Sequence, residues 1–139
     1  MCKRIVIISI FFVLFITNIF SQSFVISDIK FSEDTSVAIK QYALENTLGK
    51  ILNIRIFDNA IKLETKIKNF NYTYYKVNDS TYEYVHNREK IILKLNKVFG
   101  YIKSISLINY FDEGDWDREK NDWINHKILT GWEIIAKRK

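Results

Sequence analysis

The segment with the most chemical potential in this sequence is acidic and carries two tryptophans, Trp116 and Trp123. Calcium binds several oxygen ligands of the kind found here. A calcium loop that starts at Asp115, however, would place Lys120 where such loops require glycine. We therefore expect no metal site, and we expect these carboxylates to face solvent or cap a helix. The six carboxylates are Asp112, Glu113, Asp115, Asp117, Glu119 and Asp122.

Other catalytic or metal-binding combinations are weak. His86 and His126 are the only histidines, and they lie 40 residues apart. The only cysteine is Cys2, so no zinc-ligand spacing is present. No Gly-x-Ser-x-Gly motif marks a serine nucleophile. Hydrolysis by two carboxylates stays open because it needs only a suitable separation between them. We expect a protein without catalysis or a cofactor.

Tyrosines form a second candidate site. Aromatic rings with polar tips line ligand pockets and interfaces, although they also pack well in strands. A hairpin with a two-residue loop would place one group on the core face, namely Tyr75, Val77, Tyr82 and Tyr84. Tyr72 and Tyr74 would then point outward. We predict that Tyr72 and Tyr74, together with Trp116 and Trp123, contact a ligand or partner.

A β-hairpin over residues 51–68 organises the elements that must position these side chains. One face is apolar or small: Leu52, Ile54, Ile56, Ile61, Leu63, Thr65 and Ile67. The other face is polar: Asn53, Arg55, Lys62, Glu64, Lys66 and Lys68. This alternation is typical of strands with one buried side. Asp58 and Asn59 between the strands tolerate the positive φ angles of a tight turn.

The rest of the chain predicts more strands and one or two helices. Runs of β-branched and aromatic residues predict strands at 24–31, 72–77, 81–85, 91–95, 101–110 and 132–137. Residues 36–47 predict a short helix, with a strand as the alternative. Ser36 or Asp34 would cap its start, and Gly49 would follow its end.

The acidic segment over residues 111–123 predicts a long loop, or a loop leading into a short helix that ends near Leu129. Asp115 or Asp117 would cap that helix and Gly131 would close it. The predicted fold class is mainly β: an antiparallel meander that forms a curved sheet or a small barrel, with one or two short helices.

Residues 1–21 have the pattern of a secretory signal peptide. Lys3 and Arg4 precede an apolar run, and the small residue Ser21 offers a cleavage site. The alternative is an uncleaved anchor, but the run is shorter than the ~20 residues that a spanning helix requires. We expect one β-rich domain over residues 22–139, exported to a bacterial periplasm or secreted. Its membrane contact would then be confined to the signal peptide before cleavage.

The charge of the chain bounds its partners. The formal net charge is +5 and is spread along the sequence apart from the end, Lys137-Arg138-Lys139. Nucleic-acid binders usually concentrate such charge in a patch, so we expect no nucleic acid. We predict a non-catalytic binding module for a small apolar ligand or a protein. The alternatives are a structural or envelope-associated interaction protein without a pocket and, less favoured, a carboxylate-dependent hydrolase.

The signal-peptide pattern gives a first testable prediction. Mass spectrometry of the protein from its native host should find a mature N-terminus between residues 22 and 24. Recovery of intact Met1 in the membrane fraction would indicate an anchor instead.

Overall fold

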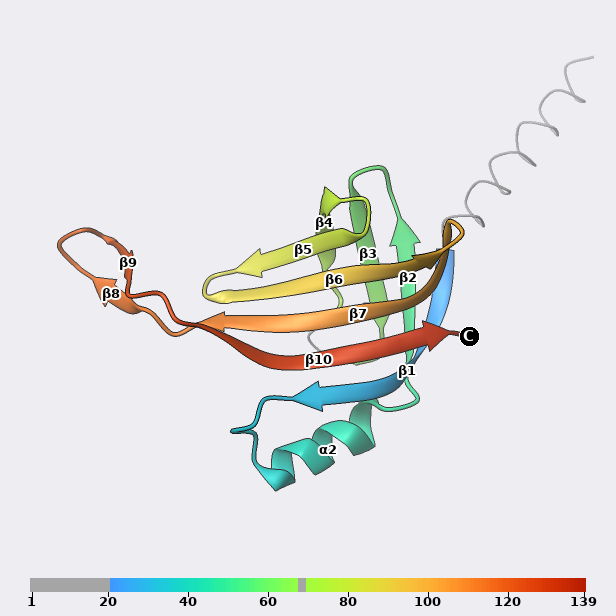
Figure 1. Cartoon of the computed structure of the whole chain (residues 1–139), viewed down its shortest axis with the longest axis horizontal. Coiled ribbons are helices and arrows are strands. Elements are labelled where there is room, and N and C mark those ends of the chain that lie inside the picture. The colour runs from blue at the N-terminus through green and yellow to red at the C-terminus, as the bar shows by residue number, and fades with distance from the viewer. Residues whose placement is uncertain (1–20, 68–69) are drawn as a thin grey trace, which may run out of the picture.

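Eight antiparallel strands close into a barrel in the computed structural model, which describes residues 21–67 and 70–139 (Figure 1). In chain order they are β1 (Ser21–Phe31), β2 (Ile51–Ile56), β3 (Ala60–Thr65), β4 (Thr73–Asn78), β5 (Thr81–His86), β6 (Glu89–Val98), β7 (Tyr101–Asp112) and β10 (Ile128–Arg138). Each strand pairs with the next one in this order, and β10 pairs with β1. The prediction of a mainly β antiparallel meander is confirmed, and of its two forms the structure has the barrel.

The hairpin formed by β2 and β3 confirms the predicted alternation. Leu52, Ile54, Ile61 and Leu63 are all buried. Arg55 and Lys62 are paired across the strands on the outer face. Neither turn residue adopts a positive φ angle, so that detail of the prediction is wrong. The return strand also ends earlier than expected, at Thr65, and Lys68 lies outside the described residues.

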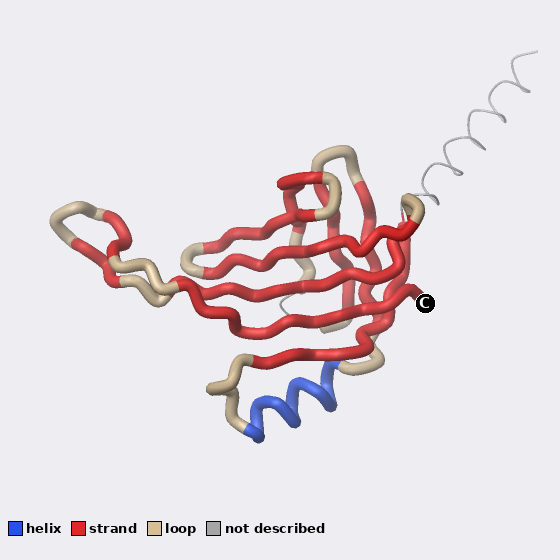
Figure 2. Tube along the Cα trace, viewed as in Figure 1, coloured by secondary structure: helices blue, strands red, loops and turns tan. Residues whose placement is uncertain are grey.

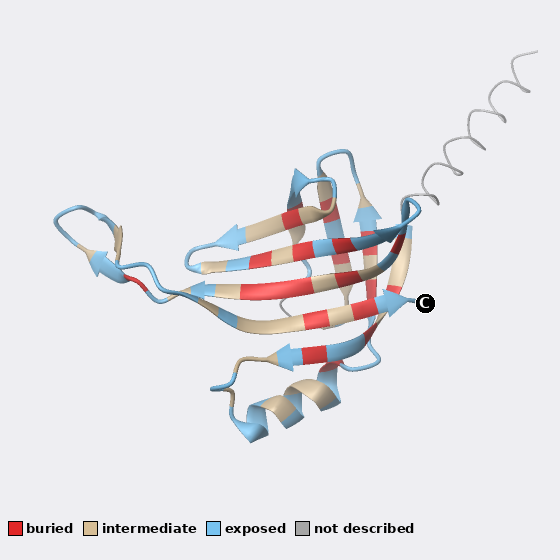
Figure 3. Cartoon of the chain, in the orientation of Figure 1, coloured by how far each residue is buried: buried red, intermediate tan, exposed pale blue. Residues whose placement is uncertain are grey.

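Apolar side chains from every strand of the barrel fill its interior (Figure 3). The largest fully buried ones include Phe24 of β1 and Tyr74 of β4. Because side chains alternate across a strand, the interior is supplied by every second residue. Bulges interrupt this alternation in several strands, and two of them determine the candidate site.

The described residues contain one α-helix, α2 (Val37–Thr47), which lies beside β1 at one end of the barrel (Figure 2). The helix alternative for this segment is therefore confirmed. The Ser36 hydroxyl accepts a hydrogen bond from the Ile39 N–H at 3.3 Å and caps the helix start. Gly49 follows the helix with a φ of +76° and donates its N–H to the Ile26 carbonyl at 2.9 Å. The second of these bonds joins the end of the helical segment to β1.

The predicted helix that ends near Leu129 is wrong. Two short strands, β8 (Asp115–Asp117) and β9 (Asp122–Ile124), form a separate hairpin that projects from the barrel (Figure 1). The Asp117 carboxylate accepts hydrogen bonds from the N–H groups of Glu119 and Lys120, which closes a turn instead of capping a helix. Asn121 follows with a φ of +50°, a conformation that does not continue a helix.

No helix among the described residues is long and apolar enough to cross a membrane.

The two faces of the β2–β3 hairpin should respond differently to substitution. Ile54→Ala and Leu63→Ala each remove buried methyl groups, so we expect each to lower the free energy of unfolding by about 2–5 kcal/mol. Lys62→Ala and Lys66→Ala alter exposed side chains and should change it by less than about 0.5 kcal/mol. Urea denaturation measures all four values. Equal losses on both faces would contradict a barrel with a single buried side.

Candidate ligand-binding site at the open end of the barrel

The tyrosines of β4 face the opposite way to the prediction. Tyr74 is completely buried, whereas Tyr75 is 64% exposed. The cause is a bulge: Lys76 pairs with Tyr82 and Asn78 pairs with Thr81, which leaves Val77 without a partner in β5. One extra residue reverses the alternation of a strand relative to its neighbour.

Tyr72 and Tyr74 therefore lie on the interior face with Tyr82 and Tyr84. The prediction that Tyr72 and Tyr74 point outward is wrong, and so is the prediction that Tyr75 and Val77 belong to the core.

The inward tyrosines gather around the ring of Tyr84. Tyr72 stacks on Tyr84 with ring centroids 4.0 Å apart, and Tyr74 meets Tyr84 edge-on at 6.2 Å. Loss of solvent, followed by the neighbouring tyrosines and the Glu89 carboxylate, raises the pKa of both Tyr72 and Tyr74. These two phenols are consequently neutral at physiological pH and available as hydrogen-bond donors.

A buried asparagine lies beside this cluster. Asn109 of β7 is completely buried, and its Nδ2 donates to Glu89 Oε1 at 2.5 Å. Its Oδ1 has no hydrogen-bond partner among the described residues, and the same is true of the buried Tyr74 hydroxyl. A buried polar group without a partner costs about 1–3 kcal/mol. Such groups need an explanation, and a bound molecule is one.

A bulge in β10 brings Asn109 close to a cavity wall. Tyr110 pairs with Thr130 and Ile108 pairs with Glu133, so Gly131 and Trp132 together lie opposite Asn109. A Cβ at position 131 would lie 2.6 Å from Asn109 Oδ1 and 2.7 Å from the Phe111 ring. Any larger residue at this position would therefore force the Asn109 amide and the Phe111 ring to shift.

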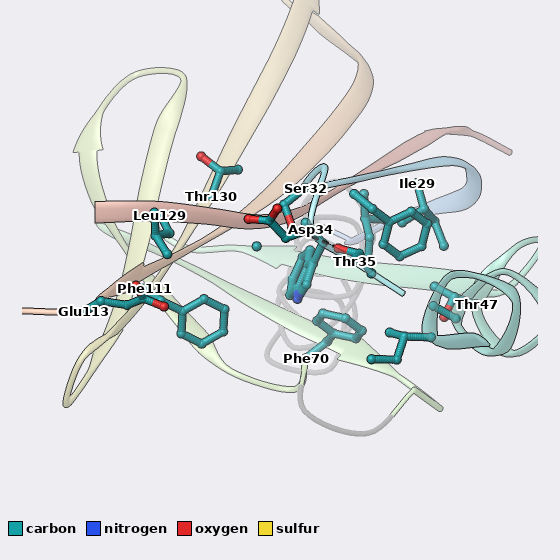
Figure 4. A pocket seen from close by; sticks show the side chains of 16 residues that line it. Ile29, Ser32, Asp34, Thr35, Thr47, Phe70, Phe111, Glu113, Leu129 and Thr130 are labelled. Atoms are coloured by element: carbon teal, nitrogen blue, oxygen red, sulfur yellow. Dashed lines mark hydrogen bonds between the residues drawn. The ribbon is translucent and has the colours of Figure 1, made fainter. Parts of the chain in front are cut away.

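The cavity has a volume of about 710 Å³ and lies at the end of the barrel that α2 and the β1–α2 turn flank (Figure 4). Its aromatic wall consists of Phe31, Phe70, Phe111 and Trp132. Phe70 packs edge-on against Trp132 with centroids 5.1 Å apart. Hydroxyl and carboxylate groups are fewer and come from Ser32, Asp34, Thr35, Thr47, Glu113 and Thr130. A mainly apolar concavity with a few polar groups is typical of a small-molecule site.

The two tryptophans lie elsewhere, on the β8–β9 hairpin. Trp116 and Trp123 are directly paired across the strands with ring centroids 5.1 Å apart. The Arg88 guanidinium lies 3.7 Å from the centroid of the Trp123 ring, and Trp116 is 47% exposed. The four predicted contact residues thus form two groups: tyrosines inside the barrel and tryptophans on the projecting hairpin.

One carboxylate at the base of this hairpin is engaged locally. Asp112 pairs with His126 and accepts the Gly114 N–H, while the Arg88 guanidinium donates to the Gly114 carbonyl. These contacts hold the base of the hairpin. Within residues 21–67 and 70–139, no three His, Cys, Asp or Glu side chains gather to hold a metal ion.

Sequence reasoning missed the residues that build the cavity. Asn109 was detectable, because it continues the inward series of Ile105 and Leu107 with a polar side chain. Phe70 and Trp132 were not, since only the folded barrel brings their distant segments together.

The Asp112–His126 pair predicts a pH dependence. The hydrogen bond between them is the main cause that raises the pKa of His126 above 6.5 and lowers the pKa of Asp112 below 3.8. The imidazolium stabilises the fold fully below pH 6.5, and this contribution disappears as the pH rises through the raised pKa. The carboxylate contributes above pH 3.8, and this contribution disappears as the pH falls through the lowered pKa.

Both contributions are therefore present between pH 3.8 and 6.5. An NMR titration of the imidazole Cε1–H should give His126 a pKa above 6.5. Asp112→Asn should return it towards that value, while Asp115→Asn on the same hairpin serves as the control. An unchanged His126 pKa in Asp112→Asn would contradict the pairing.

No protein-family model matches this sequence, and neither the curated proteins nor the solved structures give a significant match. Geometry and chemistry are therefore the basis on which a function can be proposed.

Proposed function

We propose that this protein binds a small, mainly apolar molecule in the cavity at the end of its barrel and does not transform it. The main support is the cavity itself, about 710 Å³ of concave space with four aromatic rings in its wall. Natural ligand pockets have volumes of about 300–1,000 Å³. The unpartnered Asn109 Oδ1 lies directly behind Gly131, which lines the cavity.

Catalysis is less favoured for this cavity. Asp34 and Glu113 both line it, so a carboxylate pair is present in principle. Both residues are exposed, however, whereas a carboxylic acid that donates a proton near neutral pH is usually desolvated. The two carboxylates therefore suit ligand attraction better than acid–base chemistry.

A protein partner is the second candidate, and one observation favours it. Trp116 is 47% exposed on a hairpin that projects from the barrel, and tryptophan is enriched at the centres of protein interfaces. This surface lies outside the cavity, so the two candidate functions can be tested separately. Under either proposal the protein acts after export, as the signal-peptide pattern predicts.

Filling the cavity should weaken the binding of an apolar probe. We expect N-phenyl-1-naphthylamine to gain fluorescence on binding the wild-type protein. Ala43→Phe places a ring into the cavity from α2 and should weaken this binding by at least about tenfold, which corresponds to about 1.4 kcal/mol. Fluorescence titration measures both affinities.

Ala38→Phe is the matched control, because Ala38 lies on the same helix but is exposed and does not line the cavity. It should bind the probe like the wild type, and so should Trp116→Ala. Thermal melting checks that each variant is folded. Equal probe binding by Ala43→Phe and Ala38→Phe, or none by the wild type, would overturn the proposal.

A further inference from the structure

The charge of the cavity is opposite to the charge of the protein. The whole chain has a formal net charge of +5. The charged side chains among the described residues that line the cavity are nevertheless Asp34 and Glu113, and both are acidic. The cavity entrance is therefore a locally negative region on a basic protein.

These two carboxylates are not neutralised by the ion pairs of the described structure. The five ion pairs found within residues 21–67 and 70–139 involve other acidic residues. Asp34 belongs to the turn between β1 and α2, and Glu113 follows the end of β7 (Figure 4). The Glu113 N–H donates to the Lys127 carbonyl at 2.9 Å. This hydrogen bond fixes the backbone at Glu113 and does not involve its carboxylate.

The aromatic wall has the same preference for positive charge. The faces of aromatic rings carry negative partial charge and attract ammonium groups, most strongly in tryptophan. Trp132, Phe31, Phe70 and Phe111 all line the cavity. An apolar body would bury against these rings, while a cationic group would be attracted both by the rings and by the carboxylates.

One polar group behind the cavity wall is an acceptor as well. Asn109 Oδ1 is unpartnered and approaches Gly131, which lines the cavity. The other end of the same amide is held by the Glu89 carboxylate. An ammonium group has three donors and no acceptor, so it matches the carboxylates and aromatic rings that line the cavity.

We propose that the cavity selects amphipathic amines, meaning molecules with an apolar body and a protonated amino group, over carboxylates and alcohols of the same size. This inference rests on the proposed function, since it names the class of ligand that the cavity would take. A carboxylate head group would lie close to the carboxylates of Asp34 and Glu113. Repulsion between these like charges would lower the affinity of the cavity for a carboxylate ligand.

Three probes with the same apolar chain test the proposal: octylammonium, octanoate and octanol. Each is titrated against the protein with bound N-phenyl-1-naphthylamine, and its dissociation constant is obtained from displacement of the fluorescence. We expect octylammonium to bind at least about tenfold tighter than octanoate, with octanol between them. The advantage of the amine should shrink as the salt concentration rises, because exposed charges are screened.

The double variant Asp34→Asn with Glu113→Gln should weaken octylammonium about tenfold and leave octanol unchanged. Glu33→Gln with Glu119→Gln is the matched control, because these carboxylates are also exposed but do not line the cavity. The control should bind all three probes as the wild type does. The rim carboxylates make no side-chain hydrogen bond in the described structure, so the double variant should fold, and circular dichroism checks this.

The outcomes separate the two proposals. If octanoate or octanol binds the wild type as tightly as octylammonium does, amine selection is wrong while the binding cavity stands. If the double variant keeps the full amine preference, the carboxylates do not produce it and the inference also fails. If no probe displaces the reporter and the reporter itself does not bind, the proposed function fails first.

Discussion

Pairing between β1 and β10 is the constraint on which the rest of this structure depends. These strands come from opposite ends of the described chain, and their register runs from Phe24 opposite Arg138 to Phe31 opposite Trp132. Closure turns a meander into a barrel, so one face of every strand becomes interior. It also places the β1–α2 turn next to the bulge of β10, and these two segments form much of the cavity wall. Without this pairing the residues of β1 and the residues of β10 would not face each other across the cavity.

The local pattern of residue types was sufficient to predict the structure wherever the strands are regular. The β2–β3 hairpin followed from strict alternation, because a period of two in side-chain polarity reports one buried face directly. The helix over residues 37–47 followed from helix-forming residues and a serine cap. Both features depend on neighbours in the sequence, and neither needs information about the rest of the fold.

Sequence patterns gave wrong or incomplete predictions in two situations. One is a bulge that adds a residue to a strand, and the other is a contact between segments that are far apart in the sequence. Val77 is a bulge in β4, and a single unpaired residue reverses which tyrosines are buried. The acidic segment predicts a long loop or a loop leading into a short helix, yet paired indoles and an aspartate turn make it a hairpin. The cavity combines side chains from α2, β1, β7 and β10 with Phe70, so no contiguous stretch of sequence contains its signal.

The pairing of β1 with β10, called the seam below, has a consequence for the timing of folding. Ordering a contact between the two ends of a chain requires closing a very long loop before any stabilisation is gained, and topologies of this kind fold slowly. A ribosome must also have released the segment that becomes β10 before the seam can form. The pairings of β10 with β1 and β7 are therefore the last strand pairings of the barrel that can form during synthesis.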